Sequence, residues 1–208
     1  MSFLIKFHKK EKPLNTPKNW KEALFRDFDI IYIFVIFMLL YILLFRVVVV
    51  EGDSMNQTLV DGDVLLLASS TVYHNPKQGD IIVVSKDSFR DGECFVKRVI
   101  ATEGQTVRID FRNRIVYVDE KPLDESYVYF QENDHRPMNQ GNFTEPVTVG
   151  KDCVFVMGDN RNNSQDSRHS SIGLVEKREI LGRVIFLLIP GTDEGNLPAD
   201  YSRIGGLN

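Results

Sequence analysis

Two side chains that can together form an activated nucleophile lie far apart in this chain. Ser54 follows Gly52 in a turn, and Lys97 lies in the apolar run Phe95–Ile100, which is typical of a β-strand. A serine hydroxyl attacks poorly until a base removes its proton, and a neutral lysine amine can act as that base. Taken singly, the serine is an ordinary turn residue and the lysine an ordinary sheet-edge residue. The pair is therefore a hypothesis that needs support from the rest of the chain.

A lysine base places a condition on its surroundings. Free lysine has a pKa of about 10.4, so a base that works near about pH 8 needs a pKa lowered by roughly two to three units. Side chains alternate along a strand, so Lys97 shares a face with Phe95 and Val99, while Arg98 points the other way. Burial on that apolar face would penalise the ammonium form and lower the pKa. We therefore expect Lys97 to be buried.

The charge pattern divides the 208-residue chain into three parts. Residues 1–29 form a basic arm with seven Lys or Arg and four Asp or Glu side chains, and the run Ile30–Val50 is apolar apart from Arg46. Residues 51–208 hold 17 basic and 25 acidic side chains. A helix needs about 20 apolar residues to cross a bilayer, and Arg46 can reach the lipid headgroups from near one end. We predict a transmembrane helix over residues 30–50, in contact with membrane lipid, with a cytoplasmic N-terminus and residues 51–208 outside.

Two other interpretations of the apolar run are possible. A cleaved secretory signal peptide usually has a shorter apolar region and small residues at its cleavage site, whereas here Glu51 and Gly52 follow four valines. A buried core helix would carry one apolar stripe, whereas this run is apolar on every face. We favour the uncleaved anchor.

The outer part is predicted to be mostly β. Its apolar runs are short and are separated by Gly, Asn, Asp and Pro clusters, with no long segment of helical periodicity. The predicted strands are Val64–Ala68, Ile81–Val84, Cys94–Ile100, Val107–Phe111, Ile115–Val118, Val154–Met157 and Val184–Ile189. We expect residues 51–104 and 151–208 to form a β core, and residues 105–150 a smaller β and loop insertion.

Several classes of function are disfavoured by composition. A net charge of −4 argues against a nucleic-acid binder. Cys94 and Cys153 do not form a metal-binding pair, no other His, Cys or Asp pair has ligand spacing, and no metal or cofactor is expected. The cysteines can form a disulfide or be separate strand residues, and we favour the second. A Ser/His/Asp triad would need His169 beside Asp166, with no independent support.

Four segments, in this order behind an N-terminal anchor, resemble the bacterial type I signal peptidases, which are membrane-bound serine peptidases with a Ser/Lys dyad. Ser54–Leu59 matches the family's S-M-x-P-T-L box, and Gly79–Val84 matches its Gly-Asp strand box. Phe95–Gly104 matches much of the lysine box, and Gly158–Arg168 matches the G-D-N-R-x-x-S-x-D-S-R box throughout. The chain departs from the family pattern at Gln57, Ala101, Glu103 and Gln105.

The resemblance implies a function and a set of site residues. Ser54 would be the nucleophile and Lys97 the general base, Ser164 would orient the lysine amine, and nearby charged residues would hold the loop around it. The supporting residues are Met55, Gly158, Asp159, Ser164, Asp166 and Arg168. The expected substrates are exported precursor proteins bearing signal peptides, cut after small residues, and a single span with a short insertion is similar to the Gram-positive form.

The position of Ser54 agrees with such a substrate. Ser54 lies nine residues after Phe45, a reach of at most about 30 Å, so its site is confined near the outer membrane surface. A rival hypothesis is a signal-peptidase-like assembly factor or chaperone for one exported substrate, with weak or no turnover. The motif departures motivate this rival, and retention of both Ser54 and Lys97 argues against it.

Overall fold

The computed structural model describes residues 20–89, 92–132, 134–192 and 199–207, with side chains from residue 28 onward. Residues 1–19 of the predicted basic arm lie outside this part. The chain divides into two compact units, residues 1–41 and 42–208. The division into a core of residues 51–104 and 151–208 with an insertion at 105–150 stays a prediction.

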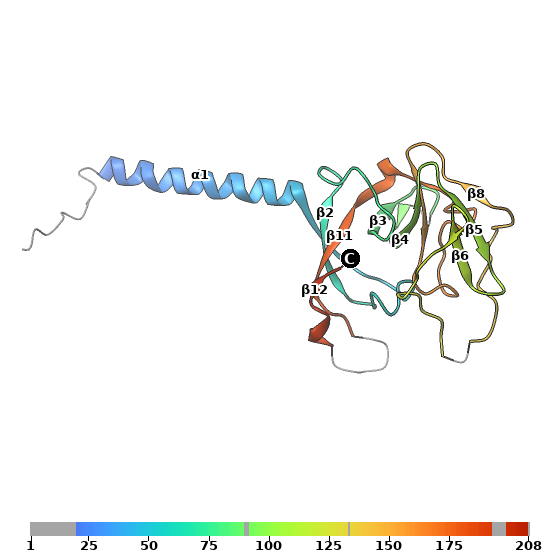
Figure 1. Ribbon diagram of the computed structural model, residues 1–208. Helices are drawn as coiled ribbons and strands as arrows, with labels where there is room; N and C mark the ends of the chain where they lie inside the picture. The colour runs from blue at the N-terminus through green and yellow to red at the C-terminus, as the bar shows by residue number, and fades with distance from the viewer. Residues whose placement is uncertain (1–19, 90–91, 133, 193–198, 208) are drawn as a thin grey trace, which may run out of the picture. The chain divides into compact units, whose positions relative to one another are not determined.

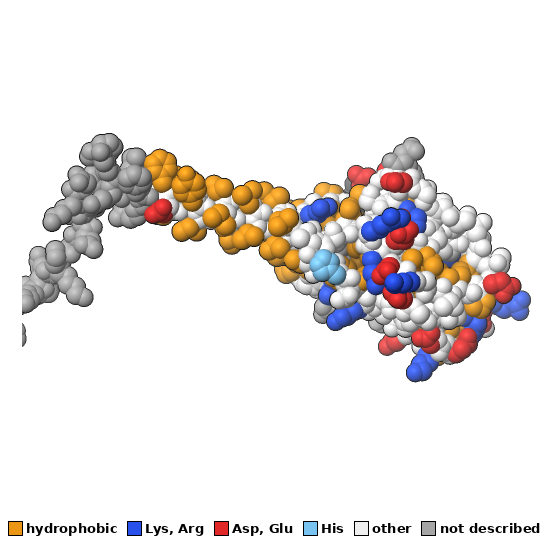
Figure 2. All heavy atoms as spheres, turned by 90° about the horizontal axis from the view of Figure 1, so that it is seen from above, with side chains coloured by type: hydrophobic (Ala, Val, Ile, Leu, Met, Phe, Trp, Pro, Cys, Tyr) orange, Lys and Arg blue, Asp and Glu red, His pale blue; other side chains and the backbone are white. Residues whose placement is uncertain are grey.

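One long helix, α1 (Trp20–Leu44), is present near the N-terminus. Its described apolar side chains, from Phe28 to Leu43, are exposed, and they cover the visible side of the helix in Figure 2. Within the described part of the chain, no helix combines the length and apolar character that a membrane crossing requires.

The predicted helix over residues 30–50 is wrong at its C-terminal end. The helix ends at Leu44, and the next residues form strand β1 (Phe45–Val49). This stretch contains three β-branched valines, and it pairs along its whole length with strand β2 (Val64–Ser69), from Phe45 opposite Ala68 to Val49 opposite Val64. Sheet pairing therefore outweighs the apolar character that suggested a continued helix.

The main sheet is antiparallel and, among the described residues, has eight strands. Its strand order is β1-β2-β11-β3-β4-β9-β10, and β12 pairs with β11 (Figure 1). Beyond β1, its strands are β2 (Val64–Ser69), β3 (Ile81–Ser85), β4 (Cys94–Thr102), β9 (Cys153–Met157), β10 (Val175–Glu176), β11 (Ile180–Ile189) and β12 (Gly205–Gly206). The expectation of a mostly β protein is confirmed.

A second sheet lies within the segment predicted as an insertion. Its order is β7-β6-β5-β8, and its strands are β5 (Thr106–Asp110), β6 (Ile115–Val118), β7 (Lys121–Pro122) and β8 (Val147–Thr148). Two short 3₁₀ helices, η2 (Lys177–Glu179) and η3 (Tyr201–Arg203), lie late in the chain. The two sheets share an apolar cluster in which Val107 and Val116 pack with Phe155 and Met157 of β9.

The main sheet is buried on both faces around β3 and β4. Ile82 and Val84 belong to one apolar cluster, while Ile81 and Val83 belong to another with Met55 and other side chains. This two-sided burial explains why these strands are continuous apolar runs. A polar side chain within such a strand is removed from water, which matters for Lys97.

The two cysteines are free. Strands β4 and β9 are antiparallel neighbours, and Thr102 at the end of β4 lies opposite Val154. Cys153 therefore lies near the end of β4 that is far from Cys94. The sheet register explains why they do not pair.

Candidate active site

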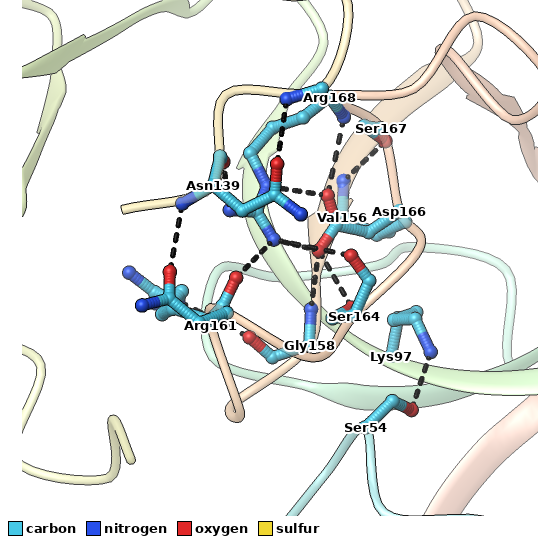
Figure 3. Close-up of polar contacts among 12 residues, drawn as sticks. Ser54, Lys97, Asn139, Val156, Gly158, Arg161, Ser164, Asp166, Ser167 and Arg168 are labelled. Carbon is cyan, nitrogen blue, oxygen red and sulfur yellow. Dashed lines mark hydrogen bonds and ion pairs between the residues drawn. The ribbon is translucent and has the colours of Figure 1, made fainter. Parts of the chain in front are cut away.

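Ser54 and Lys97 come together in the structure. The Nζ atom of Lys97 donates a hydrogen bond to Ser54 Oγ over 2.8 Å (Figure 3). It donates another to the carbonyl oxygen of Val96 over 2.9 Å. Lys97 is only 3% exposed. This is the distance at which a base can take a proton from a nucleophile.

Strand β4 positions the lysine. Lys97 lies opposite Ile82 of β3, and its neighbour Phe95 is buried against Phe89 with ring centroids 4.8 Å apart. The amine lies 5.6 Å from the centre of the Phe95 ring. As expected from strand alternation, Lys97 is thus buried on an apolar face with Phe95 and Val99.

The turn that carries Ser54 is held by two apolar anchors. Met55 and Leu59 are fully buried in the cluster formed with β2, β3 and β11. Backbone N–H groups close the turn, with Asn56 donating to the carbonyl of Asp53 over 3.1 Å and Leu59 to the carbonyl of Met55 over 2.9 Å. Met55, a predicted supporting residue, therefore fixes the backbone directly after the serine.

Gly158 lets the polar loop after β9 approach this turn. A Cβ atom at Gly158 would lie 2.5 Å from the carbonyl oxygen of Ser54 and 2.2 Å from Ser164 Oγ. The two backbones are also joined by a hydrogen bond from the N–H of Asn160 to the carbonyl of Ser54, 3.1 Å long. Glycine is needed here because any side chain would push the loop and the turn apart.

Asp166 is the centre of the loop's hydrogen-bond network (Figure 3). Its carboxylate accepts bonds from Ser164 Oγ (2.7 Å), the Gly158 N–H (3.1 Å) and the guanidinium of Arg168 (2.7 and 2.8 Å). Asp166 and Arg168 are both buried. Burial acts to raise the pKa of Asp166, but the charge of Arg168 and these hydrogen bonds outweigh it and hold the pKa below its usual value.

Asp166→Asn should destabilise the full-length protein by about 3 kcal/mol or more at pH 7, because Arg168 would be left as an unpaired buried charge. Since the folded pKa is depressed, this stabilisation is present above the unfolded value of 3.8 and is lost as the pH falls through the lower folded pKa. In urea unfolding, the difference in unfolding free energy between Asp166→Asn and wild type should therefore be smaller below about pH 4 than at pH 7.

The matched control for this change is Glu120→Gln. Glu120 also pairs with an arginine, Arg108, but its side chain is 70% exposed. An exposed pair contributes about 1 kcal/mol or less. Equal losses for the two variants would show that the buried pair has no special role.

Asp159 ties the serine turn to the lysine strand. It is fully buried and accepts two bonds from Arg98 (2.9 and 2.7 Å) and one from Thr58 Oγ1 (2.6 Å). Arg98 directly follows Lys97, and Thr58 lies in the same turn as Ser54. Arg98 and Thr58 were not among the predicted site residues. The sequence did carry a signal for Arg98, because it is a charged residue within an apolar strand.

The segment after β7 supports the loop from its other side. The N–H of Tyr129 donates to the carbonyl of Asp159 over 2.9 Å, and the guanidinium of Arg161 pairs with the carboxylate of Glu125. Arg161 is completely buried. Neither Glu125 nor Arg161 was predicted, because nothing in a single sequence brings residues 36 positions apart into contact.

The departures from the family pattern after β4 are accommodated locally. Gln105 Oε1 accepts bonds from the N–H and hydroxyl of Thr102 (2.8 and 3.0 Å), and Glu103 accepts from the N–H of Asp152 (3.0 Å). These bonds stabilise the turn between β4 and β5. They do not involve Ser54 or Lys97.

A groove of about 900 Å³ passes beside the Ser54–Lys97 pair. Its walls are residues 48–55, residues 93–97 and residues 162–165, with His169 and a few others. The contacts do not form the Ser/His/Asp alternative, because Ser54 Oγ is bonded to Lys97 and the carboxylate of Asp166 to Arg168. Among the described residues, no group of three or more His, Cys, Asp or Glu side chains is placed to hold a metal ion.

A serine hydroxyl bonded to a buried lysine amine at the wall of a groove is the geometry of a hydrolase that uses serine with a lysine base. The family model described as "Signal peptidase, peptidase S26" matches residues 24–189. The chain therefore belongs to this family.

Two named relatives agree with the family match. The chain is 38% identical over 155 residues to a protein named "Probable signal peptidase I-1" from Synechocystis, covering 71% of this chain and 73% of that one. It is 34% identical over 177 residues to a "Signal peptidase I" from Bacillus licheniformis, covering 83% and 92%. A crystal structure of a signal peptidase I from Enterococcus faecalis matches with 28% identity and a TM-score of 0.40, over 52% of this chain and 96% of that one.

Proposed function

We propose that this protein is a membrane-bound serine endopeptidase that removes signal peptides from exported precursor proteins. The observation that carries the proposal is the 2.8 Å contact between Lys97 Nζ and Ser54 Oγ, with a lysine that is 3% exposed. Family membership and the resemblance of the four boxes support the substrate class.

In this proposal, neutral Lys97 takes the proton of Ser54 Oγ as that oxygen attacks the scissile carbonyl carbon. Backbone N–H groups at the groove, that of Ser54 among them, stabilise the oxyanion. The C–N bond then breaks, and Lys97 returns the proton to the leaving amine. Water deprotonated by the same amine then attacks the ester carbonyl, the bond to Ser54 Oγ breaks, and Lys97 returns the proton to Ser54 Oγ as the product acid leaves.

The surrounding residues support this chemistry by position and by excluding water. Removal of Lys97 from solvent favours the neutral amine that the mechanism requires. Asp166 holds Ser164 beside the dyad, while Asp159 joins the serine turn to the lysine strand. We assign these residues, with Arg168, roles in positioning.

An extended segment of the precursor fits the groove. Strand β1 ends the order of the main sheet among the described residues, and Val48 and Val49 line the groove that Ser54 and Lys97 also line. An extended peptide can add to such an edge through main-chain hydrogen bonds. In this arrangement the scissile carbonyl would be carried past Ser54.

The purified protein should cut exported precursors directly after a small residue. The experiment is to incubate a panel of secretory precursors with the full-length protein in detergent and to read the new N-termini by mass spectrometry. Frequent large or charged residues immediately before the cut would contradict the proposed specificity. Failure to cut any precursor, combined with binding of one of them, would favour the assembly-factor hypothesis.

We further propose that α1 anchors the protein in the membrane. Its described apolar side chains from Phe28 to Leu43 are exposed, and residues 30–44 carry no charge. The excess of Lys and Arg in residues 1–29 favours a cytoplasmic N-terminus.

Protease added to intact, wall-stripped cells should digest residues 51–208 and spare an N-terminal tag. Lysed cells should lose both, which controls for access of the protease to the tag. Protection of residues 51–208 in intact cells would contradict the proposed topology.

A further inference from the structure

The segment Asp200–Leu207 folds back onto the serine-bearing unit, although it lies beyond the family match, which ends at residue 189. Its β12 lies beside β11 (Figure 1), with Gly205 opposite Leu187. Leu207 packs against the cluster that contains Met55. Asp200 caps η3 by accepting bonds from the N–H and hydroxyl of Ser202. The segment is thus an ordered part of the fold, held by sheet pairing and apolar packing.

Arg203 connects this segment to the serine turn. Its guanidinium donates to both carboxylate oxygens of Asp63, over 2.9 and 2.6 Å, and to the carbonyl oxygen of Thr58 over 3.2 Å. A two-pronged arginine–carboxylate contact fixes both direction and distance. The planar guanidinium therefore joins the two ends of the stretch from Thr58 to Asp63.

Asp63, the carboxylate partner of Arg203, is buried. Its side chain is fully buried and also accepts bonds from the N–H groups of Val60 and Gly191, both 2.8 Å long. Its backbone carbonyl accepts a hydrogen bond from the N–H of Val50, which lies four residues before Ser54. Asp63 is therefore bonded to residues on both sides of the serine turn.

Thr58 is held from two directions. Its hydroxyl donates to Asp159, which is paired with Arg98 beside Lys97, while its carbonyl accepts from Arg203. The hydroxyl bond to Asp159 connects the turn to the lysine strand through Arg98. The carbonyl bond from Arg203 connects the same turn to the C-terminal segment.

We infer that Arg203 is a positioning residue for the Ser54–Lys97 pair, acting through Thr58 and Asp63. This inference rests on the proposed peptidase function for its kinetic consequence. Arg203 does not line the groove, so its loss should disturb the geometry of attack more than substrate binding.

The test compares Arg203→Gln and Arg203→Lys with wild type in the full-length protein. Arg203→Gln should lower kcat for precursor cleavage about 10- to 100-fold with little change in KM, because small displacements of a nucleophile are costly. Arg203→Lys keeps the charge but loses the two-pronged contact, so its kcat should fall between those of wild type and Arg203→Gln. The matched control is Arg178→Gln, since Arg178 also lies in a 3₁₀ helix and pairs with a carboxylate, but its side chain is 80% exposed and its loss should leave kcat unchanged.

A second readout does not depend on cleavage. Hydrogen exchange followed by mass spectrometry on a peptide covering residues 50–63 should be faster in Arg203→Gln, because the N–H groups of Asn56 and Leu59 close the turn that Arg203 holds. Unchanged exchange there would overturn the inference even if the wild type cleaves no precursor. If the wild type cleaves precursors, an Arg203→Gln variant with the same kcat as wild type, measured at a temperature where both proteins are folded, would also overturn the inference.

Discussion

Lys97→Arg is expected to reduce precursor cleavage to the uncatalysed background, a loss of roughly 10⁴-fold or more in kcat/KM. Arginine keeps a positive charge and a similar length, but it does not give up a proton at working pH. The amine that lies 2.8 Å from Ser54 Oγ would be replaced by a group that cannot accept the hydroxyl proton. The measurement is cleavage of one precursor by the purified full-length variant in detergent.

Ser54→Ala should give a similar loss, and the double variant should be no worse than either single one, because the two residues act as one unit. His169→Ala is the control, and it should retain most of the cleavage although His169 lines the groove. The wild-type rate should rise with pH with an apparent pKa below the value of about 10.4 for free lysine. Survival of cleavage in Lys97→Arg would exclude a lysine base.

Gly158→Ala is expected to lower kcat/KM about 100-fold, the largest effect after those of the changes at Lys97 and Ser54. The added methyl group would lie 2.5 Å from the carbonyl oxygen of Ser54 and 2.2 Å from Ser164 Oγ, so the loop and the serine turn must separate. A displacement of about 1 Å at reacting groups can cost about 100-fold in rate. Overpacking should also destabilise the fold by about 1–3 kcal/mol.

Gly150→Ala is the matched control for this change. A Cβ atom at Gly150 meets no atom within 4 Å, and its backbone does not adopt a positive φ. Kinetics and urea unfolding of both alanine variants should therefore separate the steric effect at Gly158 from a general effect of glycine replacement. Equal behaviour of the two variants would argue against the close approach of loop and turn.

Seven longer strands of the unit that carries the site could be predicted from local sequence, because each is a short apolar run bounded by turn residues. The two-residue strands β7, β8, β10 and β12 were not predicted. Ile115–Val118 has the predicted bounds, and Cys94–Thr102 begins where predicted and continues two residues further. Strand β1 could not be separated from the helix before it, since leucine, phenylalanine and valine runs are apolar in either state. Its pairing with β2 decides the outcome, and pairing between strands is not a local property.

The candidate site was predictable only in part. The box resemblance identified Ser54, Lys97 and the loop of Asp166, and the structure brings all three together; their catalytic roles stay a proposal. Arg98 could have been suspected from its place in an apolar strand. Glu125 and Arg203 could not, because their partners Arg161 and Asp63 are distant in sequence and the pairs form only when the chain folds.

The most direct test of the central claim is to locate the acyl group of the covalent intermediate. A nitrophenyl ester of a short peptide ending in alanine would transfer its acyl group to the nucleophile and release nitrophenolate. Peptide mapping by mass spectrometry after rapid acid quenching should then find the acyl group on Ser54 in the wild type and on no residue in Ser54→Ala. An acyl group on another residue, such as Ser164 or Cys94, together with precursor cleavage by Ser54→Ala, would contradict the account.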